Sequence, residues 1–328
     1  MPELQAEAPP RLAESLTDLI GNTPMMRVPG PPDCGGAIYA KLEMFNPLSS
    51  IKDRVGYYMV NGAEARGDLQ PGGTVIEATS GNTGIALAAI CAARGYRCVI
   101  VMPDSASVER IRILQSFGAE VHLSPHQKGY IAAIEAAEVL HHQTPGSWFV
   151  RQHENPDNVA AHYETTGPEI WAALGERIDA LVCGIGTGGT ISGIGRYLKQ
   201  RNPRIRVVGV EPARSPVISE GWGGIHRIPG LNGGFIAATT DLSIIDETIT
   251  VSDEDAEQAA ARVAGSTGLF VGISAGAAYH AATEYLARHG GAEPTVATVF
   301  PDSGERYLSW KNADPLPRSP SESEEENA

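Results

Sequence analysis

Short runs of β-branched and apolar residues alternate along the chain with longer stretches that are rich in alanine. Glycine-rich turns follow the short runs, and in most cases a helical stretch comes next. Strands that alternate with helices in this way build parallel sheets covered on both faces, so the pattern predicts an α/β fold. The predicted strands span residues 38–42, 74–77, 98–102, 119–123, 180–183, 206–210 and 295–300.

The segment His153–Asn158 divides this alternation into two sets. It carries a proline among asparagines, residues that favour turns and loops. Two α/β lobes on either side of such a boundary leave a crevice, which is a common place for a ligand. The flanks 1–11 and 313–328 are rich in Pro and Glu. We expect tails there, because this composition buries too little apolar surface to offset the entropy of ordering.

Composition and charge narrow the class of protein. The 328 residues suffice for about two domains at roughly 150 residues each. Apolar residues make up 42% and charged residues 20% of the chain, which is typical of globular proteins. The formal charge of −14 disfavours nucleic acid or an anionic membrane as a partner.

Location and metal content follow from what the chain lacks. The most apolar stretch, 85–102, contains Arg94 and Arg97, so it predicts no bilayer crossing. The acidic start predicts no signal peptide. Neither the four cysteines nor the His, Asp and Glu residues show metal-ligand spacing. We therefore expect a cytoplasmic protein with reduced thiols and no metal.

Lys52 lies where a turn gives way to a helix. Asn46-Pro47 makes the turn, Ser49 or Ser50 can cap the helix, and Lys52 falls in its first turn. A positive charge there opposes the helix dipole, so the ammonium form is disfavoured. A solvated surface lysine is one interpretation. The other is an amine that forms a Schiff base, and this segment alone does not decide between them.

The segment Thr79–Gly84 is a strand end, a polar glycine turn and a helix start. Successive backbone N–H groups and hydroxyls at such a helix start form a cradle for a carboxylate. Ordinary capping by Thr79 and Ser80 would explain part of this composition, but not the whole run.

The segment Val182–Gly193 is a second strand, glycine loop and helix. Its glycines let the backbone approach a phosphate closely, and Thr187 and Thr190 add hydroxyl donors. A dinucleotide site is the alternative. The loop lacks a P-loop lysine and does not follow the first strand, so a single phosphate monoester fits better.

Two late segments complete the candidate site. Gly272–Ala277 enters an Ala-rich helix, where Ser274 is either a plain N-cap or a residue that faces a ligand. Pro301–Ser309 carries polar side chains after the last predicted strand. In an open α/β sheet that edge faces the ligand crevice.

These segments resemble, in order, the fold type II pyridoxal-phosphate-dependent β-replacement family, which includes the cysteine synthases (O-acetylserine sulfhydrylases) and is related to cystathionine β-synthase. The likeness extends from Thr17 to Trp310. It implies a tryptophan synthase β-like fold with the cofactor between two lobes. The larger, cofactor-binding lobe would comprise 12–45 and 159–312, and the smaller, mobile, substrate-binding lobe 46–158. The segments are 20–24, 46–54, 79–84, 152–156, 186–190, 272–277 and 301–309.

The resemblance also implies roles for individual residues. Lys52 would form the Schiff base with pyridoxal phosphate, Asn82 would contact the ring hydroxyl, and Ser274 would face the pyridine nitrogen. A homodimer is implied, with serine acetyltransferase as a possible partner. The residues implied for the phosphate are Gly186, Thr187, Gly188, Gly189 and Thr190, and those implied for the substrate carboxylate are Thr79, Ser80, Thr83 and Gln152.

The implied reaction is β-replacement, in which O-acetyl-L-serine and sulfide give L-cysteine and acetate through an aminoacrylate. Lys52, once released, can act as general base at the α-carbon. A serine at the ring nitrogen is a far weaker acid than a carboxylic partner. The weaker electron sink favours prompt elimination over transamination, which supports replacement chemistry from the residue type itself.

Three segments depart from the family pattern near the substrate: Leu48–Ser50, Gln127–Tyr130 and Gly230–Phe235. They leave open another O-activated serine, such as O-phosphoserine, or a nucleophile other than sulfide. A nucleotide-dependent oxidoreductase and a non-catalytic binding protein are the alternatives from other classes. O-Phosphoserine would need a cation at the leaving group, and the sequence places none of these arginines there: Arg110, Arg112, Arg214 and Arg227.

Overall fold

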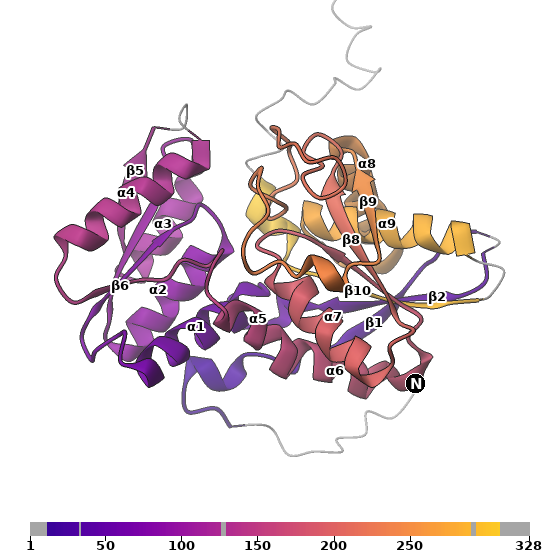
Figure 1. Cartoon of the computed structure of the whole chain (residues 1–328), viewed down its shortest axis with the longest axis horizontal. Coiled ribbons are helices and arrows are strands. Elements are labelled where there is room, and N and C mark those ends of the chain that lie inside the picture. The colour runs from indigo at the N-terminus through magenta and orange to yellow at the C-terminus, as the bar shows by residue number, and fades with distance from the viewer. Residues whose placement is uncertain (1–11, 33, 126–128, 290–292, 309–328) are drawn as a thin grey trace, which may run out of the picture.

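A computed structural model describes residues 12–32, 34–125, 129–289 and 293–308. The predicted tails 1–11 and 313–328 lie outside the described residues. The strands form two sheets, and each is covered by helices (Figure 1). The predicted α/β class is therefore confirmed. The helices are α1 (Lys52–Arg66), α2 (Asn82–Arg94), α3 (Val108–Ser116), α4 (Gly129–Gln143), α5 (Asp157–Ala161), α6 (Gly167–Leu174), α7 (Gly189–Arg201), α8 (Asp253–Thr267) and α9 (Ile273–His289).

The larger sheet has six strands in the order β1-β2-β10-β7-β8-β9. β1 pairs antiparallel with β2, and the other neighbours in this sheet are parallel. All strand ends that precede a glycine loop therefore lie at one edge of the sheet. The strands are β1 (Met25–Val28), β2 (Ala37–Leu42), β7 (Ala180–Gly184), β8 (Arg206–Pro212), β9 (Glu247–Val251) and β10 (Thr295–Phe300).

The smaller sheet has four parallel strands in the order β5-β4-β3-β6. Figure 1 shows it with α2, α3 and α4 on one side of the molecule, while the larger sheet lies on the other with α7, α8 and α9. Its strands are β3 (Thr74–Ala78), β4 (Arg97–Pro103), β5 (Glu120–Ser124) and β6 (Ser147–Phe149).

The central strands β3, β4 and β7 are buried on two faces, which explains their continuous apolar runs. In β7, Val182 packs into the core beneath α8 and α9, whereas Leu181 packs into the core beneath α6 and α7. In β4, Ile100 and Val101 divide in the same way between two cores of the smaller sheet. Side chains alternate between faces along a strand, so every position in these runs is buried.

All seven predicted strands are present, with ends shifted by at most two residues. Three further strands were not predicted. β1 and β6 are only 4 and 3 residues long, too short for a clear pattern, and β9 is an edge strand in which only Ile249 and Val251 are apolar.

Shorter elements connect the sheets and helices. They are η1 (Leu16–Leu19), η2 (Glu43–Phe45), the π-helix η4 (His162–Thr166), η5 (Gly175–Arg177), η6 (Leu242–Ile244) and η8 (Gly304–Tyr307).

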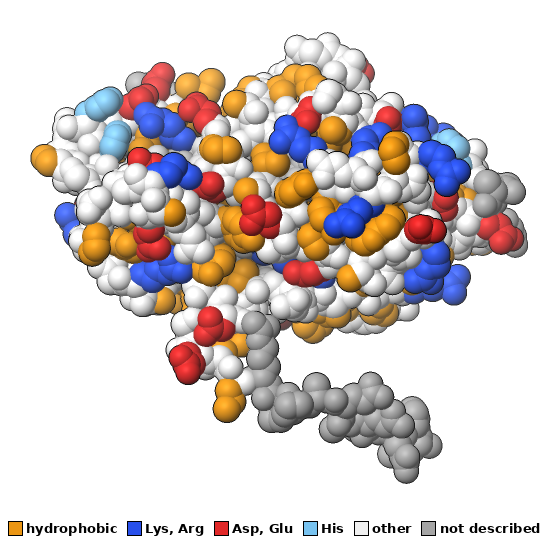
Figure 2. All heavy atoms as spheres, turned by 60° about the horizontal axis from the view of Figure 1, so that its bottom comes forward, with side chains coloured by type: hydrophobic (Ala, Val, Ile, Leu, Met, Phe, Trp, Pro, Cys, Tyr) orange, Lys and Arg blue, Asp and Glu red, His pale blue; other side chains and the backbone are white. Residues whose placement is uncertain are grey.

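Among the described residues, no helix combines the length and apolar character that a bilayer crossing needs. Within the same ranges, no three His, Cys, Asp or Glu side chains are placed to hold a metal ion. On the face shown in Figure 2, basic side chains lie among acidic ones.

Candidate active site

All the predicted site residues except Gly189 meet in two adjoining cavities of about 70 and 250 Å³. Lys52 and Asn82 line both, and so do Gly186 and Thr187. Gly189 lines neither cavity, because it packs against Asn158 at the start of α7. The smaller cavity is also lined by Gly188, Thr190 and Ser274, and the larger by Thr79, Ser80, Thr83 and Gln152.

Lys52 is the first residue of α1, as the sequence predicts. Its backbone N–H donates to Oγ of Ser50 at 3.2 Å, while Ser49 takes a left-handed conformation with φ 57°. The N-cap of α1 is Ile51 and no side chain caps the helix, so the predicted capping by Ser49 or Ser50 is wrong, and Ser50 instead closes the turn before the helix. The Asp53 carboxylate accepts the Leu48 N–H at 2.7 Å and closes the preceding turn.

A buried ionic cluster anchors Arg54, the third residue of α1. The Arg54 side chain is 1% exposed and donates to Glu43 at 2.7 Å and to Glu169 at 2.6 Å. Lys41, also 1% exposed, pairs with Glu169 at 2.6 Å. Removing one partner from such a cluster leaves an uncompensated buried charge, so the cluster holds the first turn of α1 in place.

Burial lowers the pKa of the Lys52 amine to about 8, while the nearby Cys183 opposes this shift. The sequence predicted a disfavoured ammonium from the helix dipole. The direction is the same, but the leading cause in the structure is desolvation. Burial also raises the pKa of the Cys183 thiol to about 12, so the thiol is neutral beside the amine at pH 7. A fraction of the amine is therefore unprotonated and able to act as nucleophile or base.

The loop between β7 and α7 fits the predicted phosphate site. Gly188 has φ +82°, and a Cβ on Gly186 would lie 2.2 Å from the carbonyl oxygen of Gly230. No side chain caps α7, so its first N–H groups stay open to an anion. Thr187 Oγ1 accepts from Nδ2 of Asn158 at 2.9 Å, which leaves the hydroxyl proton of Thr187 for a second partner.

The turn before α2 holds the residues predicted to bind a carboxylate. Gly81 is the N-cap, and no side chain caps the helix. Thr79 instead accepts the N–H of Gly81 at 3.1 Å. The alternative of plain helix capping by Thr79 and Ser80 is therefore wrong. Across the cavity, the Thr83 hydroxyl donates to Oε1 of Gln152 at 2.7 Å.

The buried Glu77 lies at the end of β3, below this turn. Burial raises the pKa of its carboxyl to about 8, and hydrogen bonds from Gln152 and the Arg151 backbone oppose this shift. The carboxyl is therefore mostly protonated at pH 7. It adds no full negative charge beneath a subsite predicted to receive a carboxylate.

Several lining residues were not predicted as site residues. Tyr130 and His153 both line the larger cavity and form an edge-to-face pair with ring centroids 5.4 Å apart. Phe235 lies behind them, with its ring centroid 5.2 Å from that of His153. Burial lowers the pKa of His153 to about 4, and Lys52 adds to this shift, so the imidazole is neutral. The sequence departs from the family pattern at Tyr130 and at 230–235, which indicated that these segments lie near the substrate. Only the tertiary structure shows that they lie next to each other.

Arg110 also lines the larger cavity. Its Nη1 donates to the carbonyl oxygen of Ser80 at 2.8 Å, and its guanidinium lies 5.5 Å from the ring centroid of Tyr307. The sequence could not place this arginine. β3 and β4 are parallel, so the segments that follow them lie at the same edge of the smaller sheet. Arg110 on α3 therefore lies close to the turn before α2.

Known proteins resemble the chain over most of its length. A cysteine synthase from Staphylococcus aureus is 44% identical over 298 residues, covering 90% of this chain and 96% of the relative. The structure of a cysteine synthase from Entamoeba histolytica matches with a TM-score of 0.89 and 37% identity, covering 96% of each chain.

A second solved structure, an O-ureido-L-serine synthase, matches with a TM-score of 0.88 and 38% identity, covering 94% of this chain and 98% of that one. The family model described as "Pyridoxal-phosphate dependent enzyme" matches residues 16–302. The match spans both sheets and every predicted site residue. The chain belongs to the family of pyridoxal-phosphate-dependent enzymes.

Proposed function

We propose that the protein is a cysteine synthase that converts O-acetyl-L-serine and sulfide into L-cysteine and acetate. The observation that carries this proposal is the placement of one buried amine, Lys52, in the same cavity as the glycine loop and Ser274. The similarity to cysteine synthases over most of the chain supports the same reaction.

The residues present fit pyridoxal phosphate, the cofactor of the family. Lys52 would hold its aldehyde carbon, and Asn82 would hold its ring hydroxyl. Ser274, buried in the first turn of α9, would face the ring nitrogen. The glycine loop suits the phosphate, because it lines the smaller cavity and no side chain caps the N–H groups at the start of α7. When bound, the cofactor supplies an electron sink for negative charge at the substrate α-carbon.

The chain's own residues would bind the amino acid and move its proton. Thr79, Ser80, Thr83 and Gln152 would hold the substrate carboxylate in the larger cavity. The Lys52 amine would take the α-proton, which its lowered pKa permits near neutral pH. Acetate would leave the β-carbon with the electrons of the C–O bond. Sulfide would then form the new C–S bond, and Lys52 would return a proton to the α-carbon.

The Ser274 hydroxyl would bias the chemistry towards replacement. A hydroxyl can donate a hydrogen bond to the ring nitrogen, but it cannot transfer a full proton as a carboxylic acid can. Weaker withdrawal of electrons limits the lifetime of charge spread over the ring. Loss of the β-substituent would therefore outrun transfer of the amino group.

Purified protein loaded with pyridoxal phosphate tests the proposal. We expect L-cysteine and acetate in equal amounts from O-acetyl-L-serine and sulfide, and neither product from the Lys52→Ala variant. A loaded enzyme that leaves O-acetyl-L-serine unchanged would contradict the proposed substrate.

Another β-replacement is the second candidate, with O-phosphoserine or another O-activated serine as donor, or with a nucleophile other than sulfide. Arg110 supports it, because it brings a guanidinium to the substrate cavity where an anionic leaving group could be recognised. The structural likeness to an O-ureido-L-serine synthase supports it as well. A panel of O-activated serines and nucleophiles, with products identified by mass, separates the two candidates.

We further propose how the chain is organised and where it acts. Residues 46–158 would form a smaller lobe that moves over the substrate, and 12–45 with 159–312 a larger lobe that binds the cofactor. X-ray scattering with and without substrate would detect the closure. The four free cysteines fit a reducing cytoplasm. A homodimer and an association with serine acetyltransferase are tested by light scattering and by binding of the acetyltransferase C-terminal peptide.

A further inference from the structure

We propose that Asp302 and Arg306 are positioning residues that fix the Asn82 carboxamide, so that its free N–H and not its oxygen is directed to the cofactor ring. This inference rests on the proposed contact between Asn82 and the ring hydroxyl. Asp302 and Arg306 follow the last strand of the larger sheet, whereas Asn82 starts a helix that covers the smaller sheet.

The carboxamide of Asn82 is held at both ends. Its Nδ2 donates to Oδ2 of Asp302 at 2.7 Å, and its Oδ1 accepts from Nη1 of Arg306 at 2.8 Å. A carboxamide has two N–H donors and one oxygen. With the oxygen directed to Arg306 and one N–H engaged by Asp302, the second N–H is left for the cavity that Asn82 lines with Lys52.

The charges of the two partners decide which way the amide faces. A rotation of the amide by 180° would turn its N–H groups towards the Arg306 guanidinium and its oxygen towards the Asp302 carboxylate. Both new contacts would be repulsive, because donor would face donor and acceptor would face acceptor. The remaining N–H therefore suits an oxygen that carries negative charge, such as a deprotonated ring hydroxyl.

The two partners are themselves fixed. Asp302 is 1% exposed, lies two residues after the end of β10, and its Oδ2 also accepts the hydroxyl proton of Tyr307 at 2.5 Å. Its backbone carbonyl accepts the N–H of Gly272 at 3.1 Å. Asp302 and Tyr307 line the smaller cavity together with Asn82. The acceptor for Nδ2 is thus part of the cavity wall.

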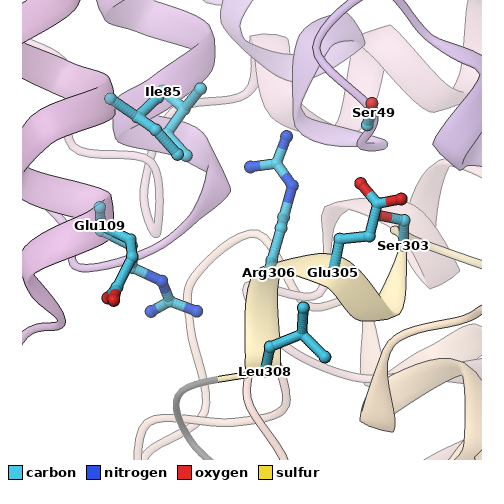
Figure 3. Close-up of a pocket in the computed structure, with 9 residues that line it drawn as sticks. Ser49, Ile85, Glu109, Ser303, Glu305, Arg306 and Leu308 are labelled. Carbon is cyan, nitrogen blue, oxygen red and sulfur yellow. The ribbon is translucent and has the colours of Figure 1, made fainter.

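Arg306 belongs to η8 and reaches across to the smaller sheet. Figure 3 shows its side chain extending between Ile85 on α2 and the loop that carries Ser49. Besides Asn82, it donates to the carbonyl oxygen of Leu48, four residues before Lys52. One guanidinium therefore contacts both the Asn82 amide and the turn that leads to the lysine.

The arrangement couples elements that belong to different sheets. Asn82 starts α2, which covers the smaller sheet, whereas the glycine loop and Ser274 are carried by the larger sheet and its helices. Asp302 and Arg306 follow β10 of the larger sheet. They therefore set the position of Asn82 relative to the phosphate loop. The cofactor needs this fixed spacing, because Asn82 would hold its ring hydroxyl and the loop would hold its phosphate.

Binding of pyridoxal phosphate without any substrate tests the proposal. In Arg306→Met, which removes the donor, we expect about fivefold weaker binding of the cofactor, because one hydrogen bond is worth about 1 kcal/mol. We also expect a change in its visible absorption in the same direction as in Asn82→Ala. Arg306→Lys should recover part of the affinity. Arg262→Met, at an exposed arginine of α8, is the matched control and should bind like wild type.

A double-mutant comparison separates positioning from a general structural role. In the Asn82→Ala background, Arg306→Met should change neither the affinity nor the spectrum further. If Arg306→Met does not fold, Asp302→Asn carries the same comparison. Additive losses of cofactor affinity in the double variant would overturn this inference but not the proposed function. Single variants at 302 and 306 that bind the cofactor like wild type would do the same. An Asn82→Ala variant with unchanged affinity and spectrum would instead overturn the proposed role of Asn82.

Discussion

The Thr83 hydroxyl donates to Oε1 of Gln152 at 2.7 Å and so connects the first turn of α2 with the segment that follows β6. The two side chains are 69 residues apart in the sequence. Both line the larger cavity, and both are at least nine-tenths buried. The bond fixes the orientation of the Gln152 amide where the substrate carboxylate is proposed to bind.

Replacing Thr83 by Val removes this bond and keeps the side-chain shape. We expect the KM for O-acetyl-L-serine to rise about fivefold while kcat changes less, because a bond of about 1 kcal/mol is lost from substrate binding. Steady-state kinetics measures both constants. Thr83→Ser keeps the hydroxyl and should stay near wild type. An equal fall in kcat and kcat/KM would instead place Thr83 in the chemical step.

Lys52 should make the reaction depend on pH. Its pKa is lowered to about 8 by burial, so the amine loses its proton as the pH rises through that value. The form that accepts the α-proton is then gained, and acetate release from saturating O-acetyl-L-serine should rise through about pH 8 and level off above it. A rate that falls across the same range would show that the protonated amine is the active form.

Glu77 should make the stability depend on pH. Burial raises its pKa from 4.5 to about 8, so between these values the folded protein holds a proton that the unfolded chain releases. Its contribution to the free energy of unfolding is complete below pH 4.5 and falls by about 1.4 kcal/mol per pH unit until the pH reaches about 8.

Glu77→Gln keeps the neutral shape and removes the titration. Denaturant unfolding across this range should give a flatter curve for the variant, which gains on wild type as the pH rises. Parallel curves for the two proteins would contradict the raised pKa.

Gly188 should tolerate no side chain. It has φ +82°, and a Cβ would lie 2.0 Å from Oγ1 of Thr240, so Gly188→Ala must displace the loop at the start of α7. We expect at least about tenfold weaker binding of pyridoxal phosphate, or about 1.4 kcal/mol.

Gly95→Ala is the matched control for this variant. Gly95 has φ +74°, a Cβ there would have no described atom within 4 Å beyond its immediate neighbours, and the residue lies outside both cavities. That change should cost about 1 kcal/mol of stability and leave the affinity for the cofactor unchanged. Equal losses of affinity for pyridoxal phosphate in the two variants would show that backbone strain in general, and not the position of Gly188, causes the loss.

Local patterns predicted much of the fold and the site because their causes are local. The run Ala180–Gly184 is apolar at every position since its strand is buried on two faces, and the glycines after it are required by the close approach at Gly186. Lys52 could be placed at a helix start from the preceding turn and serines. Such features depend on neighbours in the chain.

The contacts that sequence reasoning missed join distant residues. Arg306 and Asn82 are 224 positions apart, and no local pattern in η8 or α2 indicates their bond. Arg110 could not be assigned because its approach to Ser80 depends on how the loops after β3 and β4 meet. The cause of the lowered Lys52 pKa was also missed, since burial is a property of the assembled cavity.

A covalent link between the Lys52 amine and the aldehyde of pyridoxal phosphate is central to the proposed function. Borohydride reduction of the loaded protein, followed by peptide mapping by mass spectrometry, tests this link directly. We predict one reduced cofactor adduct, on the peptide that contains Lys52, and none in Lys52→Ala. An adduct on a different lysine, or a bound cofactor that borohydride cannot attach to the chain, would contradict the link.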